Sequence, residues 1–160
     1  MSLPKNHRGI ALVELAIVLV VLLTIAFGIT EFGRAIYQYN TLAKAARDAA
    51  RYLSTKGPTD TDAKAAAKCL AVFGKPFYGD PTCGGSTTRL APGLTTAMVS
   101  VCDAVACPTT HQAQGSAPVL NLVTVTIGGA AAPYTFTSVL SFVVPNIQFG
   151  PISVTMRQVL

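Results

Sequence analysis

The chain has 160 residues, of which 51% are hydrophobic and 12% are charged, and its formal net charge at pH 7 is +5. This length suits one domain of ordinary size, and the composition excludes a globally disordered chain, which is poor in apolar residues and rich in charge. The basic residues are scattered along the chain, so we expect no nucleic-acid partner. With two histidines and no tryptophan, the chain offers little material for a metal centre or a histidine-based active site, and we expect neither an enzyme nor a bound cofactor.

The apolar residues are concentrated near the N-terminus. Between residues 10 and 30 the one charged residue is Glu14, and no proline interrupts this segment. A helix of about 21 residues rises roughly 31 Å, which matches the hydrocarbon core of a bilayer. We therefore expect a transmembrane helix over 10–30, preceded by a short basic leader, residues 1–9. The alternatives are a buried core helix and a secretory signal that is cleaved after the small residues at 26–28.

A second helical pattern continues directly from the first. Apolar or small residues recur at three- and four-residue spacing, which is typical of an amphipathic helix, and we expect residues 31–55 to extend the span as one rod. The positions expected to pack on a globular head are Phe32, Ala35, Ile36, Tyr39, Leu42, Ala43, Ala46, Ala49, Ala50 and Leu53. The expected polar face comprises Arg34, Gln38, Thr41, Lys44, Asp48 and Arg51.

The remaining residues, 56–160, are predicted to form a small α+β head. Lys56-Gly57-Pro58 ends the rod, and Thr59 or Asp60 is suited to cap a short helix that extends to about Phe73. We expect an antiparallel sheet of three or four strands, with one face covered by the C-terminal half of the rod. Strand signals lie at 97–102, 120–127, 134–144 and 152–159, and a helix is the alternative near Ser138.

Four cysteines lie in this head, namely Cys69, Cys83, Cys102 and Cys107. An even number of cysteines in a small, loop-rich domain indicates disulfides and therefore an oxidising compartment. Three connectivities are possible, and we favour Cys69–Cys83 with Cys102–Cys107, because each of these bonds closes a short loop. A zinc site is the alternative, but the Cys-x-x-Cys pairs typical of such sites are absent. His111 lies in a polar loop, where we expect it to be solvated.

Glu14 is the most informative residue of the apolar segment. Placing a carboxylate at the centre of a membrane costs roughly 2.5–3.5 kcal/mol, so it is retained there with a partner or a function. The simpler interpretation is a position near the interface, within reach of lipid headgroups. Glu14 is the fifth residue after Gly9, and the segment from Arg8 to Glu14 has the form of a type IV prepilin cleavage site, with a basic leader, a glycine and an apolar run.

The stretch from Arg8 to Ser54 resembles the TadE-like family, which comprises minor pilins or pseudopilins of the tight-adherence (Tad/Flp) type IV pilus machinery. The resemblance rests on Glu-Phe-Gly-Arg-Ala at 31–35, Ala-Ala-Arg-Asp-Ala-Ala-Arg-Tyr at 45–52 and Val-Thr-Met-Arg at 154–157. It implies a pilin-like fold and a structural role in pilus biogenesis, adhesion and surface attachment. Family members often carry proline six residues after the acid, where this chain has Val20, which predicts a straighter helix.

The resemblance also implies cleavage between Gly9 and Ile10 by a membrane prepilin peptidase. The expected partners are this peptidase, other Tad pilus or pseudopilus subunits that contact the N-terminal helix, the inner-membrane assembly platform and the lipid bilayer. We expect a single-pass protein of the bacterial inner membrane with a cytoplasmic N-terminus and a periplasmic or extracellular head, which reaches the cell surface when a pilus is assembled.

Within this scheme, Glu14 is expected to pair with the Ile10 amine of an adjacent subunit and so to set the axial register. Gly28 and Gly33 either permit bending of the helix or allow close packing against it. Two other functions stay open: a single-pass anchored domain that binds a ligand without an assembly role, and a soluble secreted domain whose mature N-terminus lies near Ile29.

Overall fold

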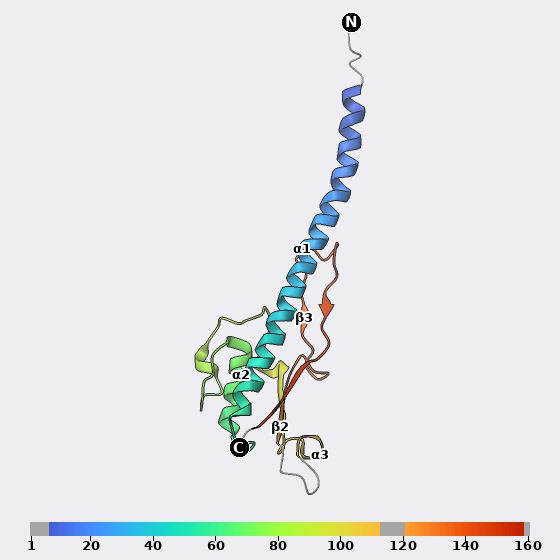
Figure 1. The fold of residues 1–160 in the computed structure, drawn as a ribbon. Helices are drawn as coiled ribbons and strands as arrows, with labels where there is room; N and C mark the ends of the chain where they lie inside the picture. Colours follow the sequence, from blue (N-terminus) through green and yellow to red (C-terminus); the bar gives the residue numbers. More distant parts are fainter. Residues whose placement is uncertain (1–6, 113–120, 159–160) are drawn as a thin grey trace.

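The computed structural model describes residues 7–112 and 121–158, which form one long helix with a head packed along its C-terminal half (Figure 1). The helix α1 (His7–Ser54) has 48 residues and continues without interruption through Val20 and both predicted hinge glycines. The predicted rod and the α+β class of the fold are therefore confirmed. Residues 1–6 of the expected leader lie outside the described residues, as do residues 120 and 159 of two expected strands.

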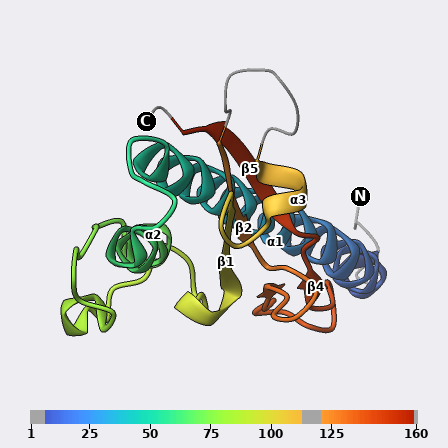
Figure 2. The same cartoon turned by 90° about the horizontal axis from the view of Figure 1, so that it is seen from below.

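The second helix, α2 (Thr61–Phe73), begins where the capping signal predicts. The carboxylate of Asp60 accepts a hydrogen bond from the Ala63 backbone N–H at 2.8 Å, and Gly74 ends the helix with a φ of 74°. Figure 2 shows α2 beside the C-terminal half of α1. Small buried side chains on both helices belong to the same core and permit this close approach: Ala46, Ala49 and Ala50 on α1, and Ala63, Ala67 and Ala71 on α2.

A three-stranded antiparallel sheet packs on α1, with the strand order β1-β2-β5. The strands are β1 (Val99–Asp103), β2 (Leu122–Ile127) and β5 (Ile152–Arg157). Alternate residues of β2 are fully buried, as the predicted period of two requires. On the other face, the hydroxyl oxygens of Thr124 and Thr155 lie 2.7 Å apart. The three strands predicted around these segments are confirmed, with small shifts of their ends.

The third predicted strand, 134–144, is wrong beyond its first residues. Only β3 (Thr135–Phe136) is extended there, and it pairs with β4 (Ile147–Gln148) in a separate two-stranded ribbon. The intervening segment, hereafter the 137–146 loop, forms neither a strand nor the helix considered near Ser138. Its backbone has other partners: the N–H of Ser138 donates to the Asn146 side chain at 3.1 Å, and the N–H of Val143 donates to the Leu140 carbonyl at 2.9 Å.

The packing face of α1 is as predicted for Ala35 and from Leu42 to Leu53, and the half-exposed Tyr39 packs against Phe149 of the head, with 5.7 Å between the ring centroids. The prediction is wrong for Phe32 and Ile36, which are 56% and 59% exposed. Their expected places against the head are taken by Glu31 and Gln38, which are 4% and 9% exposed. These polar side chains tolerate burial because the head supplies hydrogen-bond partners. For Gln38 the donor is the hydroxyl of Tyr134, 3.0 Å from its Oε1.

The remaining short elements connect these parts of the head. They are η1 (Cys83–Gly85), η2 (Thr96–Met98) and α3 (Pro108–His111).

Candidate functional site

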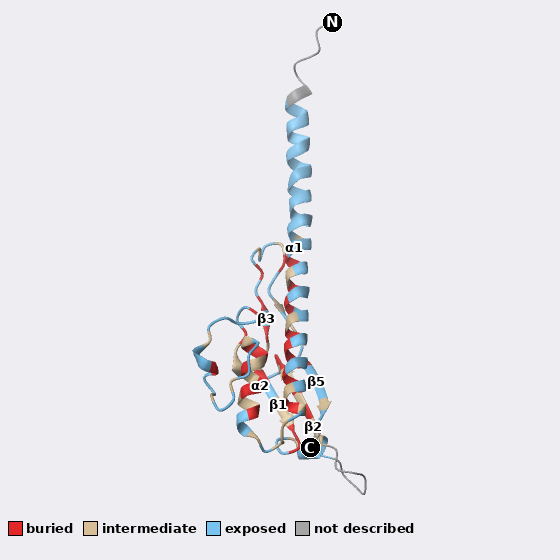
Figure 3. Ribbon diagram, turned by 60° about the vertical axis from the view of Figure 1, so that its left-hand side comes forward, coloured by how far each residue is buried: buried red, intermediate tan, exposed pale blue. Residues whose placement is uncertain are grey.

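The N-terminal half of α1 is an apolar surface that the rest of the described chain leaves uncovered. Residues 9–27 are all exposed, as the pale blue upper part of the helix in Figure 3 shows. By length and composition α1 is able to cross a membrane. A bare apolar surface of this extent is unfavourable in water, because each exposed apolar area carries a free-energy cost. This surface is consistent with anchoring of the chain in a membrane.

Gly9, Ile10 and Glu14 lie together in the first described turns of this surface. Glu14 follows Ile10 by four residues, so both side chains are on the same face, one helical turn apart. Among the side chains that the structure describes, none forms an ion pair with Glu14. A cation that pairs with this carboxylate inside a membrane must therefore come from outside the described part of the chain. The register role of Glu14 stays a prediction.

Gly28 and Gly33 mark the transition between the bare and the packed halves of α1. A Cβ on Gly28 would lie 3.7 Å from Cγ1 of Val143, which is ordinary van der Waals contact, and a Cβ on Gly33 would meet nothing within 4 Å. Packing within the described chain therefore requires glycine at neither position. The two predicted roles, bending of the helix and close packing by another subunit, both stay predictions.

The buried carboxylate of Glu31 is a polar site that the sequence analysis missed. Its Oε2 accepts hydrogen bonds from the Ser138 hydroxyl at 3.1 Å and from the Val139 N–H at 3.3 Å. The guanidinium of Arg34 donates to both carboxylate oxygens, at 2.7 and 2.9 Å. Glu31 and Arg34 thus form an ion pair one helical turn apart, and this pair is part of a larger cluster that attaches the 137–146 loop to α1.

The protonation of Glu31 reflects two opposing effects. Burial acts to raise the pKa of the carboxyl, because it disfavours the charged form. The hydrogen bonds from Arg34, Ser138 and Val139, together with the charge of Arg34, outweigh burial and hold the pKa below its usual value of 4.5. Glu31 is therefore ionised at neutral pH, in the state that accepts all these hydrogen bonds.

The four cysteines form the two disulfides that the sequence analysis favoured. Cys69 on α2 is bonded to Cys83 on η1, with a Cα–Cα distance of 5.4 Å, and Cys102 is bonded to Cys107, with a Cα–Cα distance of 5.6 Å. The first bond ties the loop after α2 back to that helix. The second closes the turn after β1. Disulfides persist in oxidising compartments, so this pairing fits a head outside the cytoplasm.

His111 and the second disulfide are the residues closest to a metal-binding arrangement. Ligand atoms of His111, Cys102 and Cys107 lie within 4.8 Å of one another, but the two sulfurs are bonded to each other and offer no thiolates. His111 is half-buried, so the expectation that it is solvated holds only in part. Its Nε2 lies 2.7 Å from the hydroxyl of Thr124, and its Nδ1 lies 2.7 Å from that of Thr110. These contacts join α3 to the sheet.

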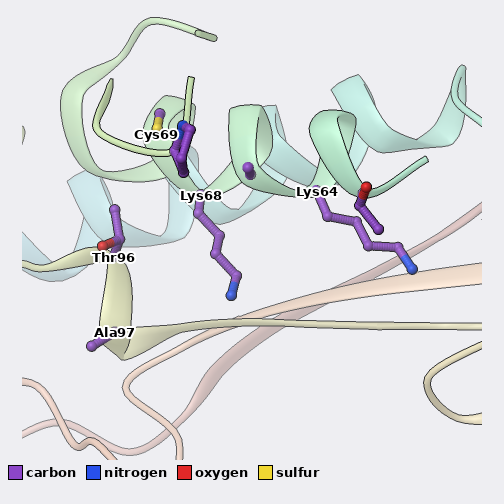
Figure 4. Close-up of a pocket in the computed structure, with 8 residues that line it drawn as sticks. Lys64, Lys68, Cys69, Thr96 and Ala97 are labelled. Carbon is purple, nitrogen blue, oxygen red and sulfur yellow. The ribbon is translucent and has the colours of Figure 1, made fainter. Parts of the chain in front are cut away.

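An open pocket of about 480 Å³ lies between α2 and η2. Figure 4 shows Lys64 and Lys68 extending from α2 along it, with Thr96 and Ala97 opposite. Lys64 is paired with the buried carboxylate of Asp103 at 2.6 Å, and Cys69 is in a disulfide. Among the described residues, those that line this pocket include no carboxylate and no imidazole.

Comparison with protein-family models matches residues 9–51 to the family described as TadE-like protein. No curated protein and no solved structure matches the chain. The matched segment contains Gly9, Glu14 and Glu31 and ends within the last turn of α1. A pilin family of this kind is structural rather than catalytic. Residues 9–51 are therefore a TadE-like segment, and the resemblance drawn from the sequence is confirmed over this range, whereas the likeness of residues 154–157 stays a prediction.

Proposed function

We propose that this chain is a minor pilin or pseudopilin of a Tad-type pilus, anchored in the inner membrane through α1 before assembly. The observation that supports this role is the division of one 48-residue helix into two halves. The first half is bare, apolar and interrupted by a single carboxylate, whereas the second half is the backbone of a disulfide-linked head. The TadE-like match spans both halves.

Processing is proposed at the bond between Gly9 and Ile10. This bond lies in the first turns of α1, which begins at His7. The first N–H groups of a helix have no intrahelical acceptor, so the end of a helix opens more easily than its middle. A peptidase can therefore bind this segment in an extended form. Cleavage removes nine of the 160 residues, leaves 151, and creates a new α-amine on Ile10.

The new amine supplies the cation that Glu14 lacks within the described chain. In a bundle of apolar helices the dielectric constant is low, and a carboxylate attracts a neighbouring ammonium strongly enough to offset much of the desolvation of both groups. We propose that Glu14 of one subunit pairs with the Ile10 amine of the next. Only one axial offset between the helices satisfies this pair, so the pair sets their register.

The test is a Glu14→Gln variant expressed in cells that assemble the pilus. Glutamine keeps the size of the side chain and removes its charge, so the variant is expected to enter the membrane normally and to co-purify at least several-fold less with other pilus components. The matched control is Asp48→Asn, which removes an exposed carboxylate from the same helix outside the apolar half. Incorporation of Glu14→Gln at the level of the control would refute the register role.

A further inference from the structure

The 137–146 loop extends along α1 toward its apolar half. Val143 lies against Gly28, whose added Cβ would be 3.7 Å from Val143 Cγ1. One turn farther along the helix, Glu31 binds Ser138 and Val139. In Figures 1 and 3 this loop is the part of the head that reaches farthest toward the N-terminal half of α1. The contacts therefore place the loop at the height of residues 28–31.

This height coincides with the end of the expected span. A helix rises 1.5 Å per residue, so Gly28 lies only about 3 Å before residue 30, where the apolar run ends. A loop that contacts Gly28 is then at the boundary between the hydrocarbon and the headgroups. This step rests on the membrane anchoring included in the proposed function.

The chemistry of the loop suits that boundary. Residues 137–146 carry no charge. Phe142 is 80% exposed and Val139 is 72% exposed, and these are the two most exposed large apolar side chains of the described head. Neither is needed in the core of the head, and both are unfavourable in water. The continuous apolar surface of α1 next to them is one that lipid already covers in the anchored protein.

We infer that the 137–146 loop docks on the lipid bilayer, with Phe142 and Val139 inserted among the headgroups and upper acyl chains of the leaflet from which α1 emerges. The head then has two attachments to the membrane, the helix and the loop, which together restrict how it tilts and rotates. Glu31 is a positioning residue in this arrangement, because its carboxylate holds the Ser138 end of the loop against α1.

The chain contains no tryptophan, so a single introduced tryptophan reports its own surroundings. The test places Phe142→Trp in the full chain, reconstituted at one copy per lipid nanodisc whose phosphatidylcholine is brominated near the top of the acyl chains. Leu19→Trp, in the bare half of α1, reports insertion of the span in matched nanodiscs whose lipid is brominated deep in the acyl chains. Val105→Trp is the matched control, because Val105 is also an exposed apolar residue of the head, 56% exposed, in the turn after β1.

Quenching of Phe142→Trp at least threefold stronger than that of Val105→Trp is the expected result, with a blue-shifted emission. If Leu19→Trp is quenched and Phe142→Trp behaves like Val105→Trp, the docking inference is overturned while membrane anchoring stands. If Leu19→Trp is not quenched by bromines placed deep in the acyl chains, anchoring itself fails, and the inference fails with it. A blue shift of the Phe142→Trp emission that appears only at several copies per nanodisc also overturns the inference, because it indicates that a neighbouring subunit covers Phe142.

The positioning role of Glu31 is tested in the same Phe142→Trp background. Glu31→Ala is expected to lower the quenching at least twofold, and Glu31→Gln, which keeps an oxygen acceptor, to restore part of it. Ser138→Ala removes one donor without disturbing α1 and is expected to act in the same direction, which keeps the test informative where Glu31→Ala unfolds the head. Where Glu31→Ala folds, unchanged quenching in that variant would refute this role; where it does not fold, unchanged quenching in both Ser138→Ala and Glu31→Gln would refute it.

Discussion

Two carboxylates on α1 have opposite surroundings, although they are separated by less than five helical turns. Glu14 is exposed on the bare half of the helix, and no described side chain pairs with it. Glu31 is buried against the head and accepts hydrogen bonds from three residues. An unpartnered acid in an apolar setting indicates a partner elsewhere, whereas a satisfied acid indicates attachment within the chain.

Of these two carboxylates, only Glu14 is recognisable from the sequence alone as a candidate functional residue. Glu14 stands out because its neighbours in sequence are apolar and Gly9 precedes it by five residues. Glu31 shows no such local signal, because Arg34 is its one partner nearby in the sequence and its other partners are far along the chain. Ser138 is 107 residues away, and no local pattern indicates a contact at that separation.

The low pKa of Glu31 makes the attachment of the loop sensitive to acid. A carboxyl whose pKa is lower in the folded state stabilises that state at pH values above its unfolded pKa, and the contribution is lost as the pH falls through the folded pKa. We therefore expect the chain to be more stable than a Glu31→Gln variant at neutral pH, with the difference shrinking below about pH 4.5. Urea unfolding of both proteins across this pH range measures the difference. A difference that is independent of pH would contradict this account.

At the scale of elements, the helices and the central strands follow local signals. The cap at Asp60, the glycine at position 74 and the alternating pattern of β2 each define an element from neighbouring residues. The rotated packing face of α1 and the 137–146 loop do not follow such signals. Phe32 and Ile36 have the right spacing for a core face, but Glu31 and Gln38 have partners in the head, and these long-range hydrogen bonds decide which face is buried.

The small residues between α1 and α2 are a requirement of this packing. Ala46 is fully buried in the core shared by the two helices. An Ala46→Leu substitution adds volume that a close-packed interior does not hold, and we expect it to destabilise the head by about 1–3 kcal/mol. The control is Lys44→Leu, an exposed position on the same helix, expected to change the free energy of unfolding by less than about 0.5 kcal/mol. Chemical denaturation compares them, and equal stability of the two variants would contradict the packing.

At the scale of the whole molecule, α1 has two different halves. The described chain leaves the first half uncovered, and the second half is part of the core of the head. The described head has its own core of α2, the three-stranded sheet and the packed half of α1, and it is closed by two disulfides. The bare half of α1 has no such cover in the described chain. This division is what a subunit needs if it waits in a membrane and then packs its helix against those of other subunits.

We propose that the bare half of α1 is processed as a pilin N-terminus. Mass spectrometry of the protein purified from the membrane of a cell that assembles the pilus tests it most directly. We expect a mature chain that begins at Ile10 and contains 151 residues, nine fewer than the 160 of the full sequence. An intact N-terminus at Met1 in the working protein would instead indicate an anchored domain without processing, and a start near Ile29 would indicate a secreted one; either result contradicts the account.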